Sequence, residues 1–188
     1  HGTGSARTIN NGIDLSGEGG LVWAKSRNQP WSNLLLDTVR GVNKVLFSHN
    51  TNSETTSSDL ITSFNNNGYT AGADATYGGI NNSSSDVASW TFRKAKGFFD
   101  VVKYTGGLST QTISHNLGCM PGMIMVKALG TSDNWCVFNR GMDPTNPSHY
   151  GMKLNTTGAK FVNAGWNVTA TTFDASISLT NSDGAEFI

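Results

Sequence analysis

Residues 19–26 read GGLVWAKS, and residues 122–129 repeat this form as GMIMVKAL, with Gly122 and Lys127 lying 102 positions after Gly20 and Lys25. A short apolar run bounded by glycine and polar residues is typical of a β-strand. Methionine replaces the tryptophan in the second copy, so the motif indicates a scaffold strand rather than a stacking site. We expect both lysines to mark the point where the strand leaves the core.

The similarity extends along most of the chain, which predicts an internal repeat. The paired stretches are RTINNG (7–12) with QTISHN (111–116), SNLLLDTVRG (32–41) with DNWCVFNRG (133–141), LFSHNTN (46–52) with MKLNTTG (152–158), and SSDVASWTF (84–92) with NSDGAEFI (181–188). We therefore expect two domains, at 1–96 and 97–188. The second copy stops before its last strand, which predicts a truncated domain, an excerpt of a longer array, or strands shared between neighbours.

The composition favours short strands joined by tight turns. Gly, Asn, Ser and Thr supply 83 of the 188 residues, while 18 aromatic residues provide core material. The predicted fold is all-β, with two tandem β-sandwich domains of jelly-roll type; a single larger lectin-like jelly roll is the alternative. The expected strands are 21–26, 33–38, 44–48, 69–71, 87–93, 98–104, 123–128, 135–139, 150–154, 173–178 and 185–188, with one helical turn within 57–64.

The charge and motif content argue against several classes of function. Thirteen basic residues balance thirteen acidic ones, so nucleic acid and membranes are not expected partners, because both are bound through clustered positive charge. The four histidines lie in turn-like contexts, and no nucleophile elbow, zinc-protease motif or phosphate loop is present. We expect no enzyme activity, no metal site and no cofactor, and we expect Cys119 and Cys136 to be unpaired.

Three aromatic residues in loop-like contexts are candidates for binding a sugar. They are Trp31 in NQPWSN, Tyr77 in ATYGG and Trp166 in AGWNVT. Each has apolar area for stacking on a sugar ring, and the flanking Asn, Ser and Gly offer hydrogen bonds to hydroxyl groups. The alternative is that each ring packs across a sheet edge.

Several sequence words together resemble a repeat of virion proteins from marine and freshwater tailed bacteriophages. They are LVWAKSR, LLDTVRG, SFNNNGY and ASWTFRK in the first copy, and TISHNLGCMPGMIMVKAL, DNWCVFNRG, MKLNTTG and GWNVTATTF in the second. The resemblance implies a structural segment of a tail fibre or capsid fibre on the virion exterior, exposed for host attachment. It also implies contacts with other virion proteins and a homo-oligomer, with a trimer favoured. The alternatives are a lectin-like module that recognises host surface glycans, and a capsid decoration protein.

Overall fold

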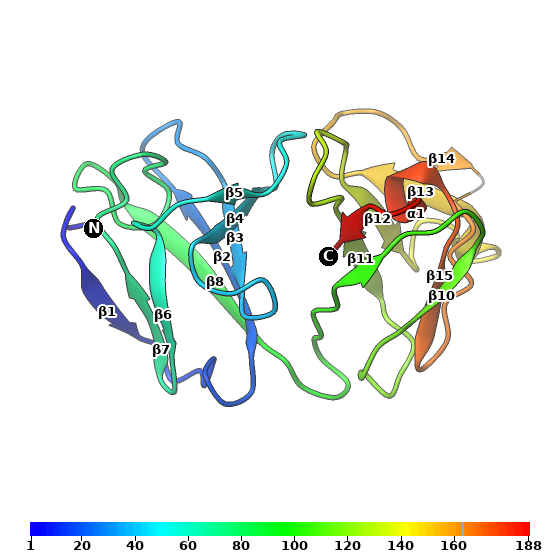
Figure 1. Cartoon of the computed structure of the whole chain (residues 1–188), viewed down its shortest axis with the longest axis horizontal. Helices are drawn as coiled ribbons and strands as arrows, with labels where there is room; N and C mark the ends of the chain where they lie inside the picture. The colour runs from blue at the N-terminus through cyan, green and yellow to red at the C-terminus, as the bar shows by residue number, and fades with distance from the viewer. Residues whose placement is uncertain (163) are drawn as a thin grey trace. The chain divides into compact units, whose positions relative to one another are not determined.

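The computed structural model describes residues 1–162 and 164–188, and it is nearly all β, with 35% of residues in strands and 3% in helices (Figure 1). The chain divides into two compact units, which we call unit 1 (residues 1–48 and 54–94) and unit 2 (residues 49–53 and 95–188). Each unit has its own hydrophobic core. The predicted all-β sandwich architecture is therefore confirmed.

Unit 1 is a sandwich of two antiparallel sheets. The small sheet has the order β1 (Arg7–Asn10), β7 (Gly68–Ala71), β6 (Ile61–Asn65). The large sheet has the order β5 (Thr55–Thr56), β4 (Lys44–Phe47), β3 (Leu34–Asp37), β2 (Gly20–Ser26), β8 (Val87–Arg93).

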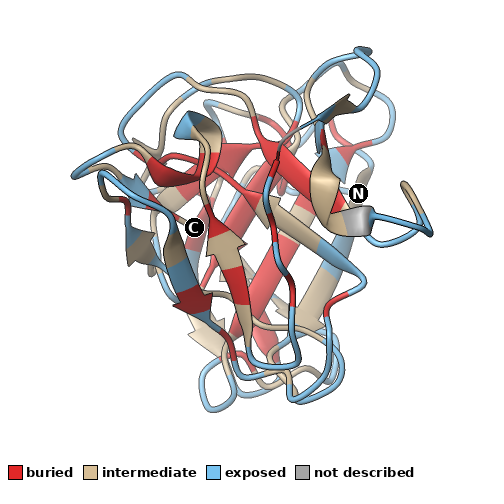
Figure 2. Cartoon of the chain, turned by 90° about the vertical axis from the view of Figure 1, so that its right-hand side faces the viewer, coloured by how far each residue is buried: buried red, intermediate tan, exposed pale blue. Residues whose placement is uncertain are grey.

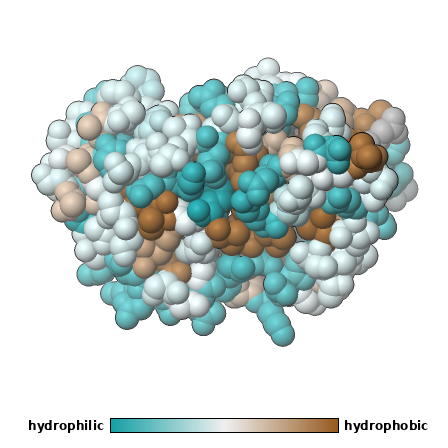
Figure 3. All heavy atoms as spheres, viewed as in Figure 1, coloured by the Kyte–Doolittle hydropathy of each residue, from teal (hydrophilic) through white to brown (hydrophobic). Residues whose placement is uncertain are grey.

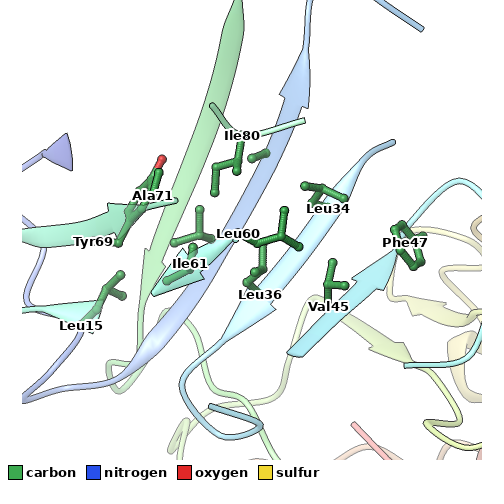
Figure 4. Close-up of a cluster of buried hydrophobic side chains, with 12 residues drawn as sticks. Leu15, Leu34, Leu36, Val45, Phe47, Leu60, Ile61, Tyr69, Ala71 and Ile80 are labelled. Atoms are coloured by element: carbon green, nitrogen blue, oxygen red, sulfur yellow. The ribbon is translucent and has the colours of Figure 1, made fainter. Parts of the chain in front are cut away.

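The core of unit 1 lies between these two sheets. Figure 4 shows Leu34, Leu36 and Val45 of the large sheet together with Ile61 and Tyr69 of the small sheet, and all five side chains are buried. Alternate residues of a strand point to opposite faces, so β2 contributes Val22 and Ala24 to this core while Leu21, Trp23 and Lys25 lie on the opposite face. Burying one such side chain stabilises the folded state by about 1.5–3 kcal/mol relative to leaving it exposed.

The described residues of unit 2 form three antiparallel sheets. The strands are β9 (Tyr104–Thr105) paired with β16 (Glu186–Phe187), β10 (Gln111–Ser114) paired with β15 (Thr172–Ala175), and a sheet in the order β11 (Met123–Val126), β12 (Cys136–Asn139), β13 (Tyr150–Lys153), β14 (Phe161–Val162). Two short helices, η1 (Pro147–His149) and α1 (Ser178–Asn181), complete the unit. The core gathers around Phe138, Trp166 and Phe173. Across the chain, buried residues are concentrated along the strands and exposed ones in the loops (Figure 2).

The two units share several of their strand pairings. Arg7 pairs with Ala71 in unit 1, and Gln111 pairs with Ala175 in unit 2, so both partners lie 104 positions later. Strands β3 and β12 pair with β2 and β11 in the same antiparallel way, 102 positions apart. The sequence repeat is therefore accompanied by a repeated arrangement of strands inside each unit.

Some local expectations were wrong. Residues 61–64, part of the stretch expected to hold a helical turn, belong to β6, because Ile61 is buried and the segment pairs with β7. Of the strand expected at 98–104, only Tyr104 belongs to a strand. Lys25 is exposed, as a lysine at a strand exit would be, but Lys127 is buried. Its Nζ donates to the backbone oxygens of Ala128 (2.8 Å) and Thr131 (3.0 Å), so this lysine holds a loop instead of reaching solvent.

Candidate ligand-binding site

The loop between β7 and β8 is wound around the buried carboxylate of Asp74. This carboxylate accepts hydrogen bonds from the backbone N–H groups of Gly78 (2.8 Å), Ile80 (2.6 Å) and Asn81 (3.1 Å). Burial raises the pKa of Asp74 above the usual aspartate value, while the N–H donors lower it. Several bonds from one loop to a single carboxylate fix the shape of that loop, as in other backbone concavities that surround an anion.

Trp31 lies against this loop at Gly78. A Cβ added to Gly78 would stand less than 3.0 Å from the Cγ, Cδ1 and Cδ2 atoms of Trp31, so one face of the indole covers the glycine. The backbone of Gly78 is held on both sides, because its N–H is bound by Asp74 and its carbonyl accepts from Ser85 Oγ (2.8 Å). The side chain of Trp31 is 39% exposed, which leaves part of the ring open to a ligand.

Tyr77 directly precedes Gly78 and is partly buried. Its ring centroid lies 5.2 Å from that of Phe47, and it packs against the core of unit 1. The structure therefore brings Trp31 and Tyr77, two of the three predicted binding residues, to the same place on unit 1. We call these two residues together with Gly78 the Trp31–Tyr77 site.

Trp166 does not join this site. It is fully buried in unit 2, where its ring packs beside Phe138 and Phe173, and its Nε1 donates to the backbone oxygen of Tyr150 (3.1 Å). A ring with no exposed face cannot stack on a sugar. The packing alternative describes Trp166, whose AGWNVT context resembles a loop but passes through a core.

A second aromatic group, on the outer face of the large sheet of unit 1, was not predicted. Trp23 of β2 lies directly opposite Trp90 of β8, with ring centroids 6.5 Å apart in an edge-to-face arrangement, and Trp90 is 52% exposed. The alternation of VASWTFR indicated which residues share a face. The register that places the two tryptophans side by side depends on the long-range pairing of β8 with β2, which the local pattern does not specify.

The potential metal-ligating side chains of the described residues are dispersed. In the ranges 1–162 and 164–188, no group of three or more His, Cys, Asp or Glu side chains is placed to hold a metal ion. Cys119 is exposed, Cys136 is buried, and both are free thiols, as expected. Burial raises the pKa of Cys136 to about 12, which keeps this thiol protonated and a poor nucleophile at neutral pH.

The fold places the chain in the class of all-β sandwich proteins. The chain is a member of the family described as Domain of unknown function (DUF7483), whose model matches residues 1–187 and so spans both units. No curated protein and no solved structure matches this chain. Among the described residues, no helix is long and apolar enough to cross a membrane.

Proposed function

We propose that this chain is a structural protein of a bacteriophage virion, a segment of a tail fibre or other surface appendage exposed for host attachment. The observation that carries the proposal is the succession of two β-sandwich units in which several strand pairings recur. Modules of this kind in series are suited to building an extended appendage. The resemblance of LVWAKSR, LLDTVRG and ASWTFRK to repeats of phage virion proteins supports the same role.

The surface agrees with a role in assembly or attachment rather than in catalysis. Charged residues make up only 14% of the chain, and the face drawn in Figure 3 is mostly of intermediate or hydrophilic character, with small hydrophobic areas between. The proposed partners are other virion proteins and further copies of this chain in a homo-oligomer, with a trimer favoured.

Location on the particle tests this proposal. Antibodies raised against the purified chain should label intact virions on the tail or on another surface appendage in electron micrographs, and chain density should be found there in a particle reconstruction. Labelling spread over the capsid lattice would instead identify a capsid decoration protein. A chain present only as a free host protein would refute both virion roles.

The second candidate function is recognition of host surface glycans, and the Trp31–Tyr77 site favours it. A partly exposed indole that rests on a fixed backbone is suited to stacking on a sugar ring, because little freedom is lost when the ligand binds. Trp31→Ala should abolish binding on a glycan array and reduce host-cell adsorption. Gly78→Ala should do the same while leaving Trp31 in the chain, because the added Cβ would displace the indole.

Two variants serve as controls for the glycan experiment. Trp90→Ala removes a more exposed tryptophan from the sheet face of the same unit and should leave binding unchanged. Tyr77→Phe keeps the packing on Phe47 but removes the hydroxyl group, so it separates hydrogen bonding from ring contact. Equal adsorption by the parent chain and all of these variants would refute the lectin-like function and leave the structural role standing.

A further inference from the structure

Strand β11 has one paired edge and one open edge. Gly122, Ile124 and Val126 direct their backbone groups toward β12, since Arg140 N donates to Gly122 O (2.9 Å) and these directions alternate along an antiparallel strand. The backbone N–H and C=O groups of Met123 and Met125 therefore point to the opposite edge. Within residues 1–162 and 164–188, no strand pairs with that edge.

The equivalent edge in unit 1 is filled. Strand β8 pairs with β2 over seven residues, from Gly20 opposite Arg93 to Ser26 opposite Val87. Because Met123 and Met125 lie 102 positions after Leu21 and Trp23, their expected partners are the counterparts of Phe92 and Trp90. An unpaired strand edge is a template for another strand, so proteins usually cover it.

Strand β16 begins the same pairing in unit 2. Ala128 is bridged to Phe187 as Ser26 is to Val87, and Lys127 exchanges two hydrogen bonds with Ile188 (3.0 and 3.1 Å) at the position where Lys25 is opposite Ala88. The pairings of Ser26 with Val87 and of Lys25 with Ala88 in unit 1 are thus reproduced at Ala128 and Lys127 in unit 2. The next two positions on this edge of the strand are Met125 and Met123.

We propose that the open edge of β11 is a strand-accepting site, filled by an extended segment that continues β16 in the register of Ser89–Arg93 of unit 1. A strand joined to Ile188 fits this edge, because Ile188 already pairs with Lys127, the residue directly after β11. A separate strand would have to end immediately next to Ile188 on the same edge. The inference depends on the sheet geometry of unit 2 and on the β2–β8 register of unit 1, and it is independent of the proposed function.

The side chains around the edge specify the accepted segment. In unit 1, Ser89 and Thr91 lie opposite the core residues Ala24 and Val22, while Trp90 and Phe92 point to the outer face. In unit 2, Val126 and Ile124 take the inner positions, and Met123, which is 51% exposed, takes an outer one. The accepted strand therefore carries small residues inward and large apolar residues outward, where they cover Met123 and Met125.

The test adds such a strand to the whole chain. The sequence SWTFR, copied from Ser89–Arg93, is appended directly after Ile188, and amide hydrogen exchange is measured by NMR. We expect the Met123 and Met125 amides to exchange at least about tenfold more slowly than in the parent chain. The amides of Ile124 and Val126, which face β12, report whether unit 2 remains folded.

The matched control is the extension SPTPR, in which proline replaces the two added residues whose N–H groups would bond to β11. Equal exchange at Met123 and Met125 for the SWTFR and SPTPR extensions, with Ile124 and Val126 protected in both, would overturn the proposal. Protection of Met123 and Met125 in the unextended chain that increases with protein concentration would also overturn it, because a second copy would then fill the edge.

Discussion

The repeated motif is GGLVWAKS in unit 1 and GMIMVKAL in unit 2, and the strand that follows it ends differently in the two units. In unit 1, β3 ends at Asp37, and in unit 2, β12 ends at Asn139, 102 positions later. Asp37 and Arg40 form a buried ion pair, with side chains only 3% and 2% exposed. In unit 2, Asn139 Oδ1 accepts a hydrogen bond from Gly141 N (2.8 Å), and the neighbouring Arg140 is exposed.

Similar turns can therefore be stabilised with or without buried charge. In unit 1, Asp37 Oδ1 also accepts from the N–H groups of Val39 (3.0 Å) and Arg40 (2.9 Å), and the Arg40 guanidinium donates to Leu35 O (2.9 Å) and contacts Glu54 (3.5 Å). Each buried charge is thus compensated by several partners. Such a network is sensitive to loss of one member, because the other charge is then left buried without its partner.

The largest expected effect comes from breaking this network. Arg40→Ala should lower the free energy of unfolding of unit 1 by about 3–5 kcal/mol, because Asp37 remains buried and uncompensated. The change is measured by urea unfolding, with hydrogen exchange of the amides in β2 and β3 as the readout for unit 1. Arg140→Ala in unit 2 is the matched control and should leave the urea midpoint nearly unchanged, since this side chain is exposed. A comparable loss of stability in both variants would show that the ion network is not the cause.

A second comparison concerns a buried asparagine in each unit. Asn81 Nδ2 donates to Ser5 O (2.7 Å) and Gly72 O (2.5 Å), and its Oδ1 accepts from Thr3 N (3.1 Å). Asn181, 100 positions later, donates to Ser109 O (2.7 Å) and accepts from Gly107 N (2.9 Å). Asn81 ties residues near the N-terminus to the loop between β7 and β8, and Asn181 ties residues 107–109 to α1, but Asn81 satisfies more backbone groups.

Asn81→Ala should therefore cost more than Asn181→Ala. We expect losses of about 2–4 kcal/mol in unit 1 and about 1–3 kcal/mol in unit 2, because each substitution removes several hydrogen bonds and, in unit 1, deprives the buried Gly72 carbonyl of a partner. Thermal unfolding of the two variants, with the exposed Asn66→Ala as control, measures the order. A larger loss for Asn181→Ala would contradict the idea that the number of satisfied backbone groups sets the cost.

The sequence was sufficient to predict the strand class but not the places where distant segments meet. Trp31 and Tyr77 were identified as loop residues from their Pro, Asn and Gly neighbours, and both lie outside strands. Their proximity depends on the winding of one loop around Asp74, which no local pattern indicates. Trp166 has similar neighbours and yet is buried, since an irregular segment with polar flanks can still contribute a ring to a core.

Strand β6 shows the same limit from the other side. Its sequence context is rich in Ser and Thr and was assigned to a helical turn, but pairing with β7 and the burial of Ile61 place it in the small sheet. For short polar segments, tertiary pairing overrides local preference. The long apolar strands, such as β2 and β3, were predicted well because burial on one or both faces leaves a strong pattern.

The smallest expected effect compares the two lysines of the shared motif. Burial lowers the pKa of Lys127 from the usual 10.5 to about 8, with Asp133 opposing the shift. The unfolded chain then binds more protons than the folded one between these values, so the stability of unit 2 should increase as the pH rises above about 8. Cys136 acts in the opposite direction from about pH 9, because its thiol stays protonated in the fold while it ionises in the unfolded chain. The contribution of Lys127 is therefore clearest between about pH 8 and pH 9, where we expect a gain of less than about 1 kcal/mol.

Urea unfolding across this interval should show the increase in the parent chain and in Lys25→Met, whose lysine is exposed, but not in Lys127→Met. If Lys25→Met removed the pH dependence as completely as Lys127→Met, the burial of one lysine would not explain it.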